Sequence, residues 1–576
     1  MRRRTSLAAA AAFSAAWALG ACGIPTDRAP EVVGDAPTDF DSSSAANPTV
    51  YEPTADADET VENFFRAASG DPDSRDDRLN KFTLSGDAQF SEPSEGIYLV
   101  TALDVAVGDS SDIHSVTVRV TGSVVGTYLE NGSVRMNATA ADYDETFTMQ
   151  RDDISDVWKM SQQPVRVALD YGHFTDAYEQ SPMYFQSGQE ELLVPDLRWI
   201  YSELDAETGQ RLRLTWLTLG GPSDFAAVSS RNPIPSGTVG KVVDGDDGVE
   251  VDLSSSESID DEDTVTAIAA QLVWSLGIRG GFTLTTDGEV RFTGDAAEFR
   301  DWNKIPPNLP ETAYFIAENT VWEYSVEAGV TQQSDEHPWV GFEANGLQQV
   351  AVAPSGRIAA IAAGNGGDVL LTGVSTSTMG EVGGLSGVLA DPQWLDDGTL
   401  LVIDDGQPTL VVAATGATQR LGIGEEATAM ALAADGRRLA YVEDGHAWVA
   451  PLGLDGDGNL TVGDPRRIGP DIENVADLAW SSENYLWVAG DRDADQLFRV
   501  AVDNSRTVPQ AGTATFLPIT QIAANPADPT QVNADRGEPV IIVASSTLYR
   551  VYTSGPDGIK NDGQPVNGTS PFTVLQ

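Results

Sequence analysis

The sequence predicts a multidomain protein in which two small α+β units precede a long all-β region of repeats. Three observations lead to this prediction. The chain begins like an exported protein, two amphipathic helix patterns stand among strand-like runs before residue 305, and a strand–turn–strand pattern recurs from residue 305 onward. A length of 576 residues is sufficient for several domains of ordinary size.

Composition restricts the partners of the protein. The chain has 34 Lys and Arg residues against 87 Asp and Glu residues, a formal net charge of −53. Such a charge excludes nucleic acid as a partner, because phosphates are bound by clusters of Lys and Arg. It also argues against electrostatic adhesion to anionic lipid. We therefore interpret the acidic surface as a source of solubility.

The first residues have the pattern of a secretory signal. A basic start at Arg2–Arg4 precedes an apolar run from Leu7 to Leu19, and small residues follow before Cys22. The apolar run has about 14 residues, fewer than the roughly 20 that cross a bilayer. Residues 1–21 are therefore interpreted as a removable signal peptide.

Cys22 is the only cysteine of the chain, so the sequence predicts no disulfide framework. The segment Leu19-Gly20-Ala21-Cys22 resembles the bacterial lipobox. The resemblance implies cleavage before Cys22, an S-diacylglycerol group on its thiol, and an N-acyl group such as palmitate on its new amino group. Because two acyl chains anchor a protein stably, it implies a lipid anchor on the extracytoplasmic face of the cell membrane.

Residues 22–55 are rich in Pro, Asp, Ser, Thr and Ala and are interpreted as a lipidated flexible tether. Residues 56–170 follow as the first α+β unit. A helix is predicted from apolar residues at i, i+3, i+4 and i+7: Val61, Phe64, Phe65 and Ala68. An antiparallel meander is predicted from strand-like runs at 97–107, 116–125, 145–150, 157–160 and 165–169. The unit resembles the cystatin-like or NTF2-like fold, which often holds a pocket. Because no group of polar residues marks a pocket here, we expect an interaction or spacer domain.

Residues 171–304 are predicted to form a second α+β unit, whose clearest element is a helix. One face from Val265 to Leu276 is apolar, and we expect Asp263 to cap its start and Gly277 its end. Further along, Asp287-Gly288 stands between two strand-like runs and predicts a hairpin.

The order of signals in this second unit resembles the GerMN domain of spore-germination and cell-envelope proteins. The resemblance rests on Tyr184-Phe185, the strand-like run 192–195, Gly220-Gly221-Pro222, the turn 234–238, the strand-like run 251–253 and the helix bearing Gln271-Leu272. Residues 212–219 fit a helix or a strand equally well. GerMN domains are not known as enzymes, so the resemblance implies binding of a partner or an envelope component.

Residues 305–576 repeat a strand, a turn and a second strand. The copies lie at 350–359, 390–400, 430–440, 478–486 and from 522 onward. Turn residues about 40–47 positions apart, short strands and no helical pattern predict a β-propeller. A strand at 314–324 is expected to complete the ring. Six blades are favoured, and five and seven stay open.

The sequence contains no recognisable catalytic motif. Its histidines are far apart, and none belongs to a His-Glu-x-x-His pair: His114, His173, His337 and His446. No Gly-x-Ser-x-Gly elbow and no Gly-rich phosphate loop ending in Lys-Ser or Lys-Thr occurs. We therefore expect no enzymatic activity, no catalytic residue, no metal site and no cofactor.

One acidic turn has a spacing of oxygen-bearing residues that resembles a cation-binding loop. Oxygen-bearing side chains alternate along 455–459, as they do in Ca²⁺ loops. An EF-hand would place a Glu where Arg466 stands, so a polar hairpin at the edge of a blade is the favoured interpretation. Whether acidic turns of the chain bind Ca²⁺ stays open at this point.

The order of lipobox, tether, α+β unit, GerMN-like unit and propeller resembles the LpqB family of actinobacterial lipoproteins. The resemblance implies a non-enzymatic accessory of the MtrA–MtrB two-component system, which contacts the extracytoplasmic domain of an MtrB-like sensor kinase and affects cell-envelope homeostasis and division. The alternative is a lipoprotein that binds envelope glycan or peptidoglycan, with Trp394, Trp448 and Trp480 as candidate exposed aromatics. A propeller enzyme is disfavoured, because no nucleophile set or ring of metal-binding carboxylates is visible.

Overall fold

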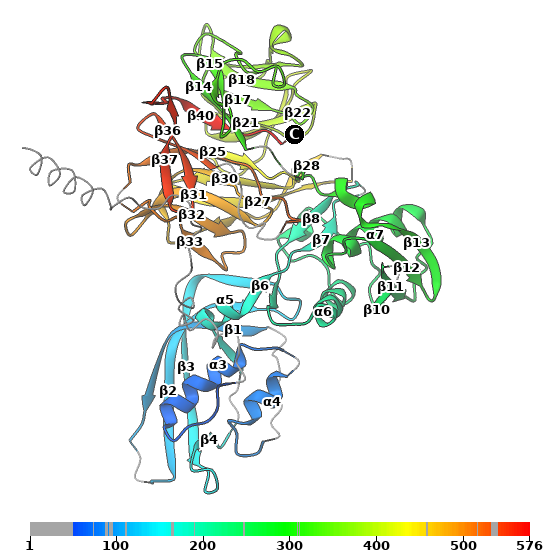
Figure 1. The fold of residues 1–576 in the computed structure, drawn as a ribbon, viewed down its shortest axis with the longest axis vertical. Coiled ribbons are helices and arrows are strands. Elements are labelled where there is room, and N and C mark those ends of the chain that lie inside the picture. The colour runs from blue at the N-terminus through cyan, green and yellow to red at the C-terminus, as the bar shows by residue number, and fades with distance from the viewer. Residues whose placement is uncertain are drawn as a thin grey trace, which may run out of the picture. The chain divides into compact units, whose positions relative to one another are not determined.

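The computed structural model describes residues 50–575, apart from 73, 87–89, 91–95, 110–111, 163–165, 189, 246–247, 308, 310, 457–458, 515 and 532–539. Figure 1 shows the helices and strands of the described residues in chain order by colour. The signal peptide, Cys22 and the tether up to residue 49 lie outside the described residues. Among the helices of the described part, none combines the length and the apolar character needed to cross a bilayer.

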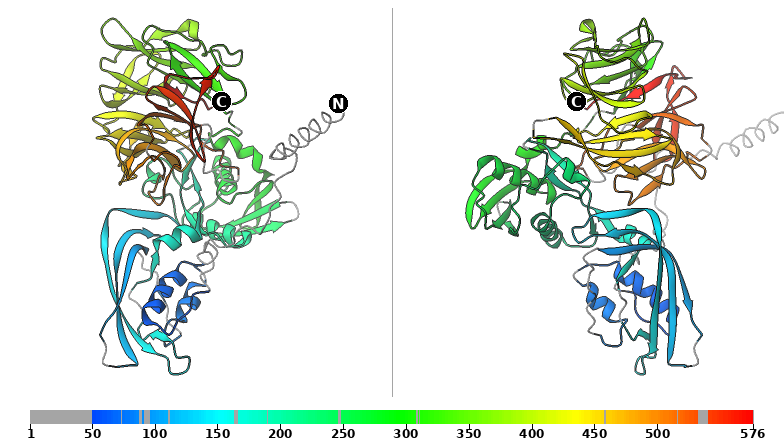
Figure 2. Two further views of the ribbon diagram at one scale, coloured as in Figure 1. Left: turned by 60° about the vertical axis from the view of Figure 1, so that its left-hand side comes forward. Right: turned by 180° about the vertical axis from the view of Figure 1, so that it is seen from behind.

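The first α+β unit is a five-stranded sheet with helices on one face (Figure 2). Its sheet order is β4-β3-β2-β1-β5. The elements are α3 (Ala57–Ala68), α4 (Arg75–Asn80), β1 (Ile97–Val107), β2 (Ser115–Tyr128), β3 (Val134–Arg151), β4 (Trp158–Met160) and β5 (Ala168–Asp170). Phe64 and Phe65 of α3 are both 1% exposed and pack against the ring of Phe147, which confirms the predicted apolar helix face.

The predicted meander is correct for β1 to β4 and wrong for the last strand. β5 lies at the opposite edge of the sheet from β4 and pairs in parallel with β1, where Tyr98 lies opposite Ala168. The sequence pattern tells which face of a strand is buried but not which neighbour it takes. An open edge on β1 would leave a row of unpaired backbone groups, and β5 covers part of that edge.

The second unit combines a four-stranded sheet, in the order β10-β11-β12-β13, with helices α6 and α7. Its elements are α5 (Tyr171–Ala177), β6 (Tyr178–Gln180), β7 (Met183–Gln186), β8 (Leu193–Asp196), β9 (Trp199–Tyr201), α6 (Ala206–Leu219), η2 (Ala226–Val228), β10 (Val239–Gly245), β11 (Gly248–Ser254), α7 (Glu262–Ser275), β12 (Gly281–Thr286), β13 (Glu289–Asp295) and η3 (Ala296–Trp302). The open question at 212–219 is settled in favour of a helix, whose start is capped by Asp205 accepting from the backbone N–H of Thr208.

The cap predicted for the clearest helix is wrong by two positions. Asp261, not Asp263, caps α7, because its carboxylate accepts from the backbone N–H of Thr264 at 3.0 Å. Several acidic residues stand together here, so composition alone could not select the one with extended backbone geometry. At the other end Gly277 adopts a φ of +67°, as expected of a glycine that follows a helix. The hairpin at Asp287-Gly288 is confirmed as the turn between β12 and β13.

The described part of the third unit contains six antiparallel sheets in succession, the architecture of a β-propeller. Their strands, sheet by sheet, are β14 (Thr312–Ala317), β15 (Thr320–Ser325), β16 (Gly329–Thr331) with β40 (Thr569–Phe572); β17 (Gln349–Val352), β18 (Ile358–Ala363), β19 (Asp368–Gly373), β20 (Gly380–Glu381); β21 (Leu389–Trp394), β22 (Thr399–Asp404), β23 (Gln407–Val412), β24 (Ala417–Arg420); β25 (Ala427–Leu432), β26 (Arg438–Glu443), β27 (His446–Leu454), β28 (Leu460–Val462), β29 (Arg466–Ile468); β30 (Glu473–Trp480), β31 (Tyr485–Arg492), β32 (Asp495–Ala501), β33 (Thr507–Pro509); and β34 (Ile519–Ala524), β35 (Val540–Ala544), β36 (Thr547–Tyr552), β37 (Gly555–Gly558). The short elements η4 (Thr376–Thr378), β38 (Lys560–Asn561) and β39 (Gln564–Pro565) lie outside these sheets.

The ring is completed differently from the prediction. Segment 314–324 is not one strand but the hairpin of β14 and β15, which turns at Glu318 and Asn319 with φ values of +53° and +61°. The innermost strand of that sheet is β40, from the other end of the propeller, and it pairs with β14. The first and last strands of the domain thus share one sheet, which protects the edges of the ring.

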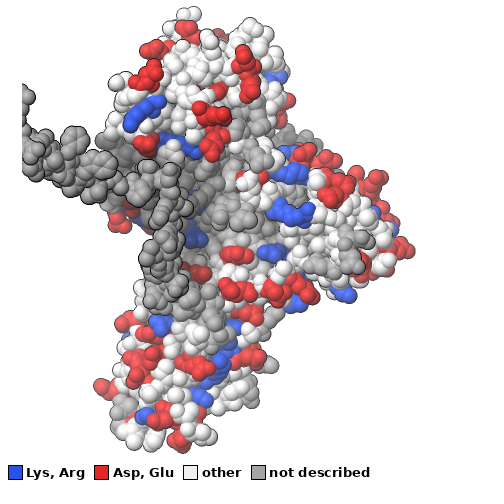
Figure 3. All heavy atoms as spheres, viewed as in Figure 1, with Lys and Arg blue, Asp and Glu red and all other residues white. Residues whose placement is uncertain are grey.

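Acidic side chains outnumber basic ones over the face of the molecule seen in Figure 3, as the net charge requires. The structure confirms the predicted fold class: two α+β units and a C-terminal propeller.

Candidate functional site at the domain junction and in the propeller channel

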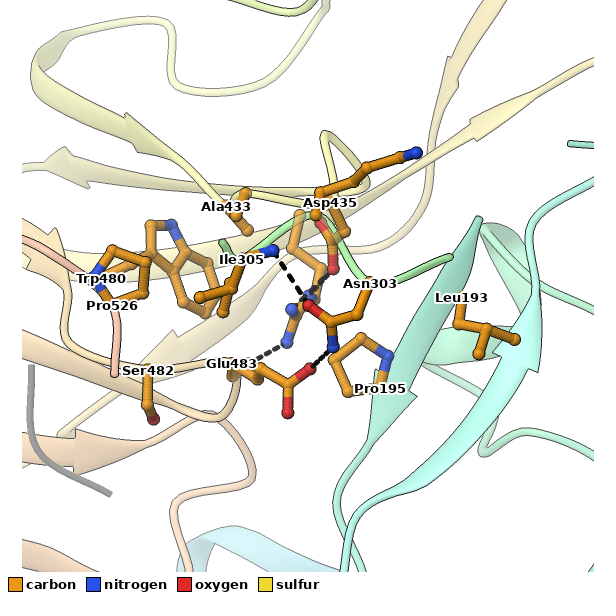
Figure 4. A pocket seen from close by; sticks show the side chains of 13 residues that line it. Leu193, Pro195, Asn303, Ile305, Ala433, Asp435, Trp480, Ser482, Glu483 and Pro526 are labelled. Carbon is orange, nitrogen blue, oxygen red and sulfur yellow. Dashed lines mark hydrogen bonds and ion pairs between the residues drawn. The ribbon is translucent and has the colours of Figure 1, made fainter. Parts of the chain in front are cut away.

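A buried carboxyl group joins the second unit to the propeller. Glu483 lies in the turn between β30 and β31 and is 6% exposed. The hydroxyl of Tyr184, from β7, donates to its Oε2 at 2.7 Å, and the side-chain amide of Asn303, just after η3, donates to its Oε1. Figure 4 shows Asn303 and Glu483 facing one another across the boundary between the two units.

Arg438, a cation beside Glu483, forms its ion pair with another carboxylate of the propeller. Arg438 of β26 donates from Nη2 and Nε to Oδ2 of Asp435 at 2.6 and 2.9 Å. Its guanidinium also lies 4.9 Å from the ring centre of Trp480 and donates to the backbone carbonyl of Glu483. The carboxyl group of Glu483 therefore receives its side-chain hydrogen bonds from neutral donors.

Burial has a clear electrostatic effect at this place. Loss of hydration raises the pKa of Glu483 to about 7, although the hydrogen bonds from Tyr184 and Asn303 act in the opposite direction. Burial, followed by the proximity of Glu483, also raises the pKa of Tyr184 well above its usual value. The space left beside these groups is about 10 Å³, room for roughly one water molecule. The junction is thus a closed polar contact and not a substrate pocket.

Further contacts extend the junction in both directions. Arg437 forms an ion pair with Glu190, in the loop between β7 and β8, and its Nε donates to the hydroxyl of Ser187 at 2.8 Å. At a second contact the indole N–H of Trp199, a fully buried residue, donates to Oδ2 of Asp503 at 3.1 Å. The segment from 178 to 201 therefore contacts the propeller at several points.

The propeller encloses a channel of about 1040 Å³. The inner strands β17, β21, β25, β30, β34 and β40 all contribute residues to its wall, and Glu190, Glu191, Lys304 and Pro306 of the second unit and its linker also line it. The volume lies at the upper end of the range found for small-molecule sites.

Polar side chains on the wall of this channel link several inner strands to the inner strand of the next blade. Along one half, Oε1 of Gln349 accepts from the backbone N–H of Asp391 at 2.6 Å, and Oδ2 of Asp391 accepts from the backbone N–H of Met430 at 2.9 Å. The other half repeats the pattern: Asp477 accepts from Ile522 N–H at 2.7 Å and Gln521 from Ser570 N–H at 2.8 Å. These carboxylates and amides therefore hold inner strands together.

The two carboxyl groups among these side chains influence one another. Burial raises the pKa of Asp391 to about 6, against hydrogen bonds from Met430 and Gln349 that lower it. Burial and, after it, the charge of Asp391 raise the pKa of Asp477 well above its usual value. The pair therefore resists carrying two full charges near neutral pH.

Three family models match the chain, in the order in which the structure arranges its parts. Residues 51–175 match "Lipoprotein LpqB, N-terminal domain", residues 182–292 match "Sporulation and spore germination", and residues 330–545 match "Lipoprotein LpqB beta-propeller domain". The chain belongs to the LpqB family. The family resemblance predicted from the sequence is thereby confirmed.

Relatives named "Lipoprotein LpqB" match this chain over most of their length. The protein of Corynebacterium jeikeium is 24% identical over 535 residues, which cover 88% of each chain. The protein of Mycobacterium tuberculosis is 24% identical over 593 residues, which cover 95% of this chain and 93% of the relative. The coarse prediction of a lipoprotein agrees with these names.

Solved structures resemble this LpqB-family chain only in part. Virginiamycin B lyase of Staphylococcus aureus, in an inactive variant, is 8% identical with a TM-score of 0.29 and covers 46% of this chain and 90% of its own. Hsv2 of Kluyveromyces lactis is 12% identical with a TM-score of 0.28 and covers 44% of this chain and 74% of its own. Scores this low carry no argument about function.

The structure does not bring the four histidines of this LpqB-family chain together. His114 lies in the loop before β2, and each of the others has its own polar neighbour in a different sheet or helix: His173 beside Asp170, His337 beside Glu323 and His446 beside Arg467. Among the described residues there is no group of three or more His, Cys, Asp or Glu side chains that could hold a metal ion.

The acidic turn at 455–459 and the three candidate tryptophans differ in how they compare with the sequence predictions. Asp455 accepts from the backbone N–H of Asn459 at 2.8 Å, as in a polar hairpin turn, while residues 457–458 lie outside the described part. Trp394 and Trp480 line the channel, and Trp448 does not appear in its wall. Trp480 is only 6% exposed, so it is a buried residue and not an exposed aromatic.

Sequence reasoning missed the buried acids of this site. Asp391 and Asp477 both stand within apolar inner strands, and a carboxylate at equivalent places in two repeats is a signal that could have been noticed. Glu483 carried no such signal, because Ser482, Glu483 and Asn484 look like an ordinary exposed turn. Its side-chain hydrogen bonds come from Tyr184 and Asn303, which lie about 300 and 180 positions earlier in the chain.

Proposed function

We propose that the protein is a membrane-anchored lipoprotein without enzymatic activity that binds the extracytoplasmic domain of an MtrB-like sensor kinase and modulates its signalling. The observation that carries the proposal is the similarity to LpqB lipoproteins along nearly the whole chain. The site supports a non-enzymatic role, because the carboxyl groups of Glu483, Asp391 and Asp477 all accept hydrogen bonds that hold the protein together.

The tether gives this proposal a physical basis. A lipid on Cys22 confines the folded part to the layer of space beside the membrane, on the extracytoplasmic face. Confinement by a short flexible tether raises the effective concentration of a binding partner to about the millimolar range, so that a weak interface suffices. Binding modulates a kinase only if one signalling state of the sensor is bound more tightly than the other.

Direct binding tests the proposal. The mature chain with Cys22→Ser, which carries no lipid, is titrated against the purified extracytoplasmic domain of the sensor. We expect a Kd of high micromolar or tighter, and a change in autophosphorylation when lipidated protein and full-length sensor share one vesicle. Absence of binding at high micromolar concentration, together with unchanged phosphorylation in vesicles, contradicts the proposal.

The channel supports a second candidate, a lipoprotein that binds glycan or peptidoglycan fragments of the envelope. Its volume of about 1040 Å³ and the indole ring of Trp394 in its wall favour a ligand with both apolar and hydroxyl-bearing faces. Calorimetry with soluble cell-wall fragments tests it. Binding that weakens about tenfold in Trp394→Ala and stays unchanged in Trp448→Ala would support this candidate over the first.

A further inference from the structure

Two loops meet at one end of the sheet of the first unit. The loop between β1 and β2 and the loop between β3 and β4 are neighbours, because Ser115 lies opposite Gln150 in the register and the backbone N–H of Arg151 donates to the carbonyl of His114 at 3.0 Å. β1 ends at the same place, with Val107 opposite Val118. Three separate segments of the chain therefore come close together at this end of the sheet.

Large apolar side chains at this end are unusually exposed. Ile154 is 96% exposed, Ile113 is 78% exposed and Val107 is 49% exposed. Among the exposed large apolar residues of the described part, Ile154 has the highest exposed fraction and Ile113 the next. Scattered single apolar residues are normal on a surface, whereas several that lie at one end of a sheet are a candidate for an interaction surface.

The turns that carry the two isoleucines are held in shape. The carboxylate of Asp112 accepts from the backbone N–H of His114 at 2.9 Å, and that of Asp152 accepts from the backbone N–H of Ile154 at 2.9 Å. The bond to Ile154, together with an ion pair to Lys159 at 3.0 Å, holds the pKa of Asp152 below its usual range. The isoleucines are thus presented on ordered turns, which lowers the entropy lost when they bind.

The surroundings of the isoleucines are acidic. Asp109, Asp112 and Asp153 are exposed within the same two loops. The cations there are engaged: Arg151 with Asp156 at 2.7 Å and Lys159 with Asp152. Carboxylates repel the anionic surface of a membrane and attract Lys and Arg on a protein. The charge therefore favours a protein partner over a lipid surface.

This end of the sheet also lies far from the contacts that hold the domains together. β2 runs from Ser115 at the loops to Tyr128, whose hydroxyl donates to the carbonyl of Trp199 at 2.9 Å beside the propeller. At about 3.3 Å per residue its 14 residues span roughly 45 Å. Figures 1 and 2 show the long strands leading away from β6 and α5 to this end.

We propose that the sheet tip, formed by Val107, Ile113 and Ile154 with Asp109, Asp112 and Asp153 around them, is the docking surface for the sensor's extracytoplasmic domain. The partner surface is an apolar hollow bordered by Lys and Arg side chains. The two isoleucines enter the hollow, and the carboxylates meet the basic border. This inference rests on the proposed function and names the part of the chain that performs it.

The test compares two pairs of substitutions on the mature chain with Cys22→Ser. Ile113→Ser with Ile154→Ser removes the apolar part of the tip. Leu219→Ser with Val290→Ser is the matched control, because those side chains are 74% and 65% exposed on the second unit. All four positions are exposed, so circular dichroism and melting temperature are expected to match those of the parent chain.

We expect the tip pair to weaken binding to the purified sensor domain at least tenfold and the control pair to change it less than twofold. Asp109→Asn, Asp112→Asn and Asp153→Asn together should weaken binding and flatten its dependence on salt. If the parent chain binds and the tip pair binds equally well, the docking surface is refuted and the proposed function stands. If the parent chain neither binds the sensor domain at high micromolar concentration nor changes its phosphorylation in vesicles, both are refuted. A third outcome would also refute the docking surface. The parent chain would sediment with phosphatidylcholine vesicles, the tip pair would not, and the two would bind the sensor domain equally, so that the tip would be a lipid contact.

Discussion

At the scale of single residues, Glu483 shows how docking changes the chemistry of a side chain. Its pKa rises to about 7 from an ordinary value of 4.5 because the second unit removes it from water. The folded chain therefore keeps a proton that the unfolded chain has released. The stability from this proton is fully present below about pH 4.5 and is lost as the pH rises through about 7.

Glu483→Gln removes this titration. Because a shift of one pKa unit corresponds to about 1.4 kcal/mol, Glu483 makes the wild type less stable near pH 8 than near pH 4.5 by about 3 kcal/mol. The free energy of unfolding of the variant should fall less steeply over this range, which denaturant titrations at several pH values measure. Glu381→Gln, on the exposed strand β20, is the control and should keep the wild-type slope. Equal slopes for the wild type and Glu483→Gln would contradict the prediction.

The carboxyl groups of the channel allow a second test at the residue scale. The charge of Asp391 is one cause of the raised pKa of Asp477. Asp391→Asn removes that charge, so the carboxyl group of Asp477 should titrate at lower pH, as ¹³C chemical shifts of its side chain would show. Asp405→Asn, an exposed position in the turn after β22, should leave the titration unchanged. An unmoved titration in Asp391→Asn would mean that the two groups do not interact.

At the scale of elements, the closure of the propeller depends on β40. The ring of Phe572 stacks on that of Tyr314 with centroids 5.2 Å apart, and Phe572 packs against the core cluster around Tyr314. Both ends of the domain meet in this pair. The strand is therefore expected to stabilise the propeller more than its four residues suggest.

Phe572→Ala tests this expectation. Loss of a large, partly buried aromatic side chain should lower the free energy of unfolding by about 2–3 kcal/mol, a little less than in a fully buried site. Val326→Ala, in the exposed turn after β15 of the same sheet, should cost less than about 0.5 kcal/mol. Denaturant unfolding followed by tryptophan fluorescence measures both. Similar effects of the two substitutions would show that β40 contributes little to closure.

Helices and strands could be predicted from the sequence where the local pattern of apolar residues is enough to identify the element. The strand at 97–107 and the apolar face beginning at Val265 were both located correctly, because alternation and helical spacing are local properties of the sequence. β5 and β40 were misplaced or missed because each takes a partner far away in the chain, β1 and β14. β40 also contains Pro571 and only four residues, which conceals its strand pattern.

At the scale of the whole molecule, the order of the parts could be predicted and the junctions between them could not. The two α+β units and the repeats can each be recognised from patterns in consecutive residues. The contacts Tyr184–Glu483 and Trp199–Asp503 join residues about 300 positions apart. Nothing in the sequence around these residues marks the contacts as buried. The junction part of the candidate site could therefore not be predicted from the sequence, whereas the repeated carboxylates Asp391 and Asp477 of the channel left a signal in it.

The proposed lipid anchor on Cys22 can be tested at the scale of the whole molecule. In Cys22→Ser the thiol that would carry the diacylglycerol group is gone, and with it the acyl chains that hold the protein at the membrane. The mature variant should leave the membrane fraction and show no acyl mass, as fractionation and mass spectrometry would record.

The same variant separates anchoring from binding. The folded part is unchanged, so its affinity for the sensor domain in solution should equal that of delipidated wild type, while signalling in cells should fall because the local concentration near the sensor is lost. Ser43→Ala in the tether is the control and should behave like wild type in both assays. A Cys22→Ser protein that stays with membranes without acyl mass would contradict the lipid anchor. Full signalling by a released protein would instead contradict the role of confinement, because binding alone would then be sufficient.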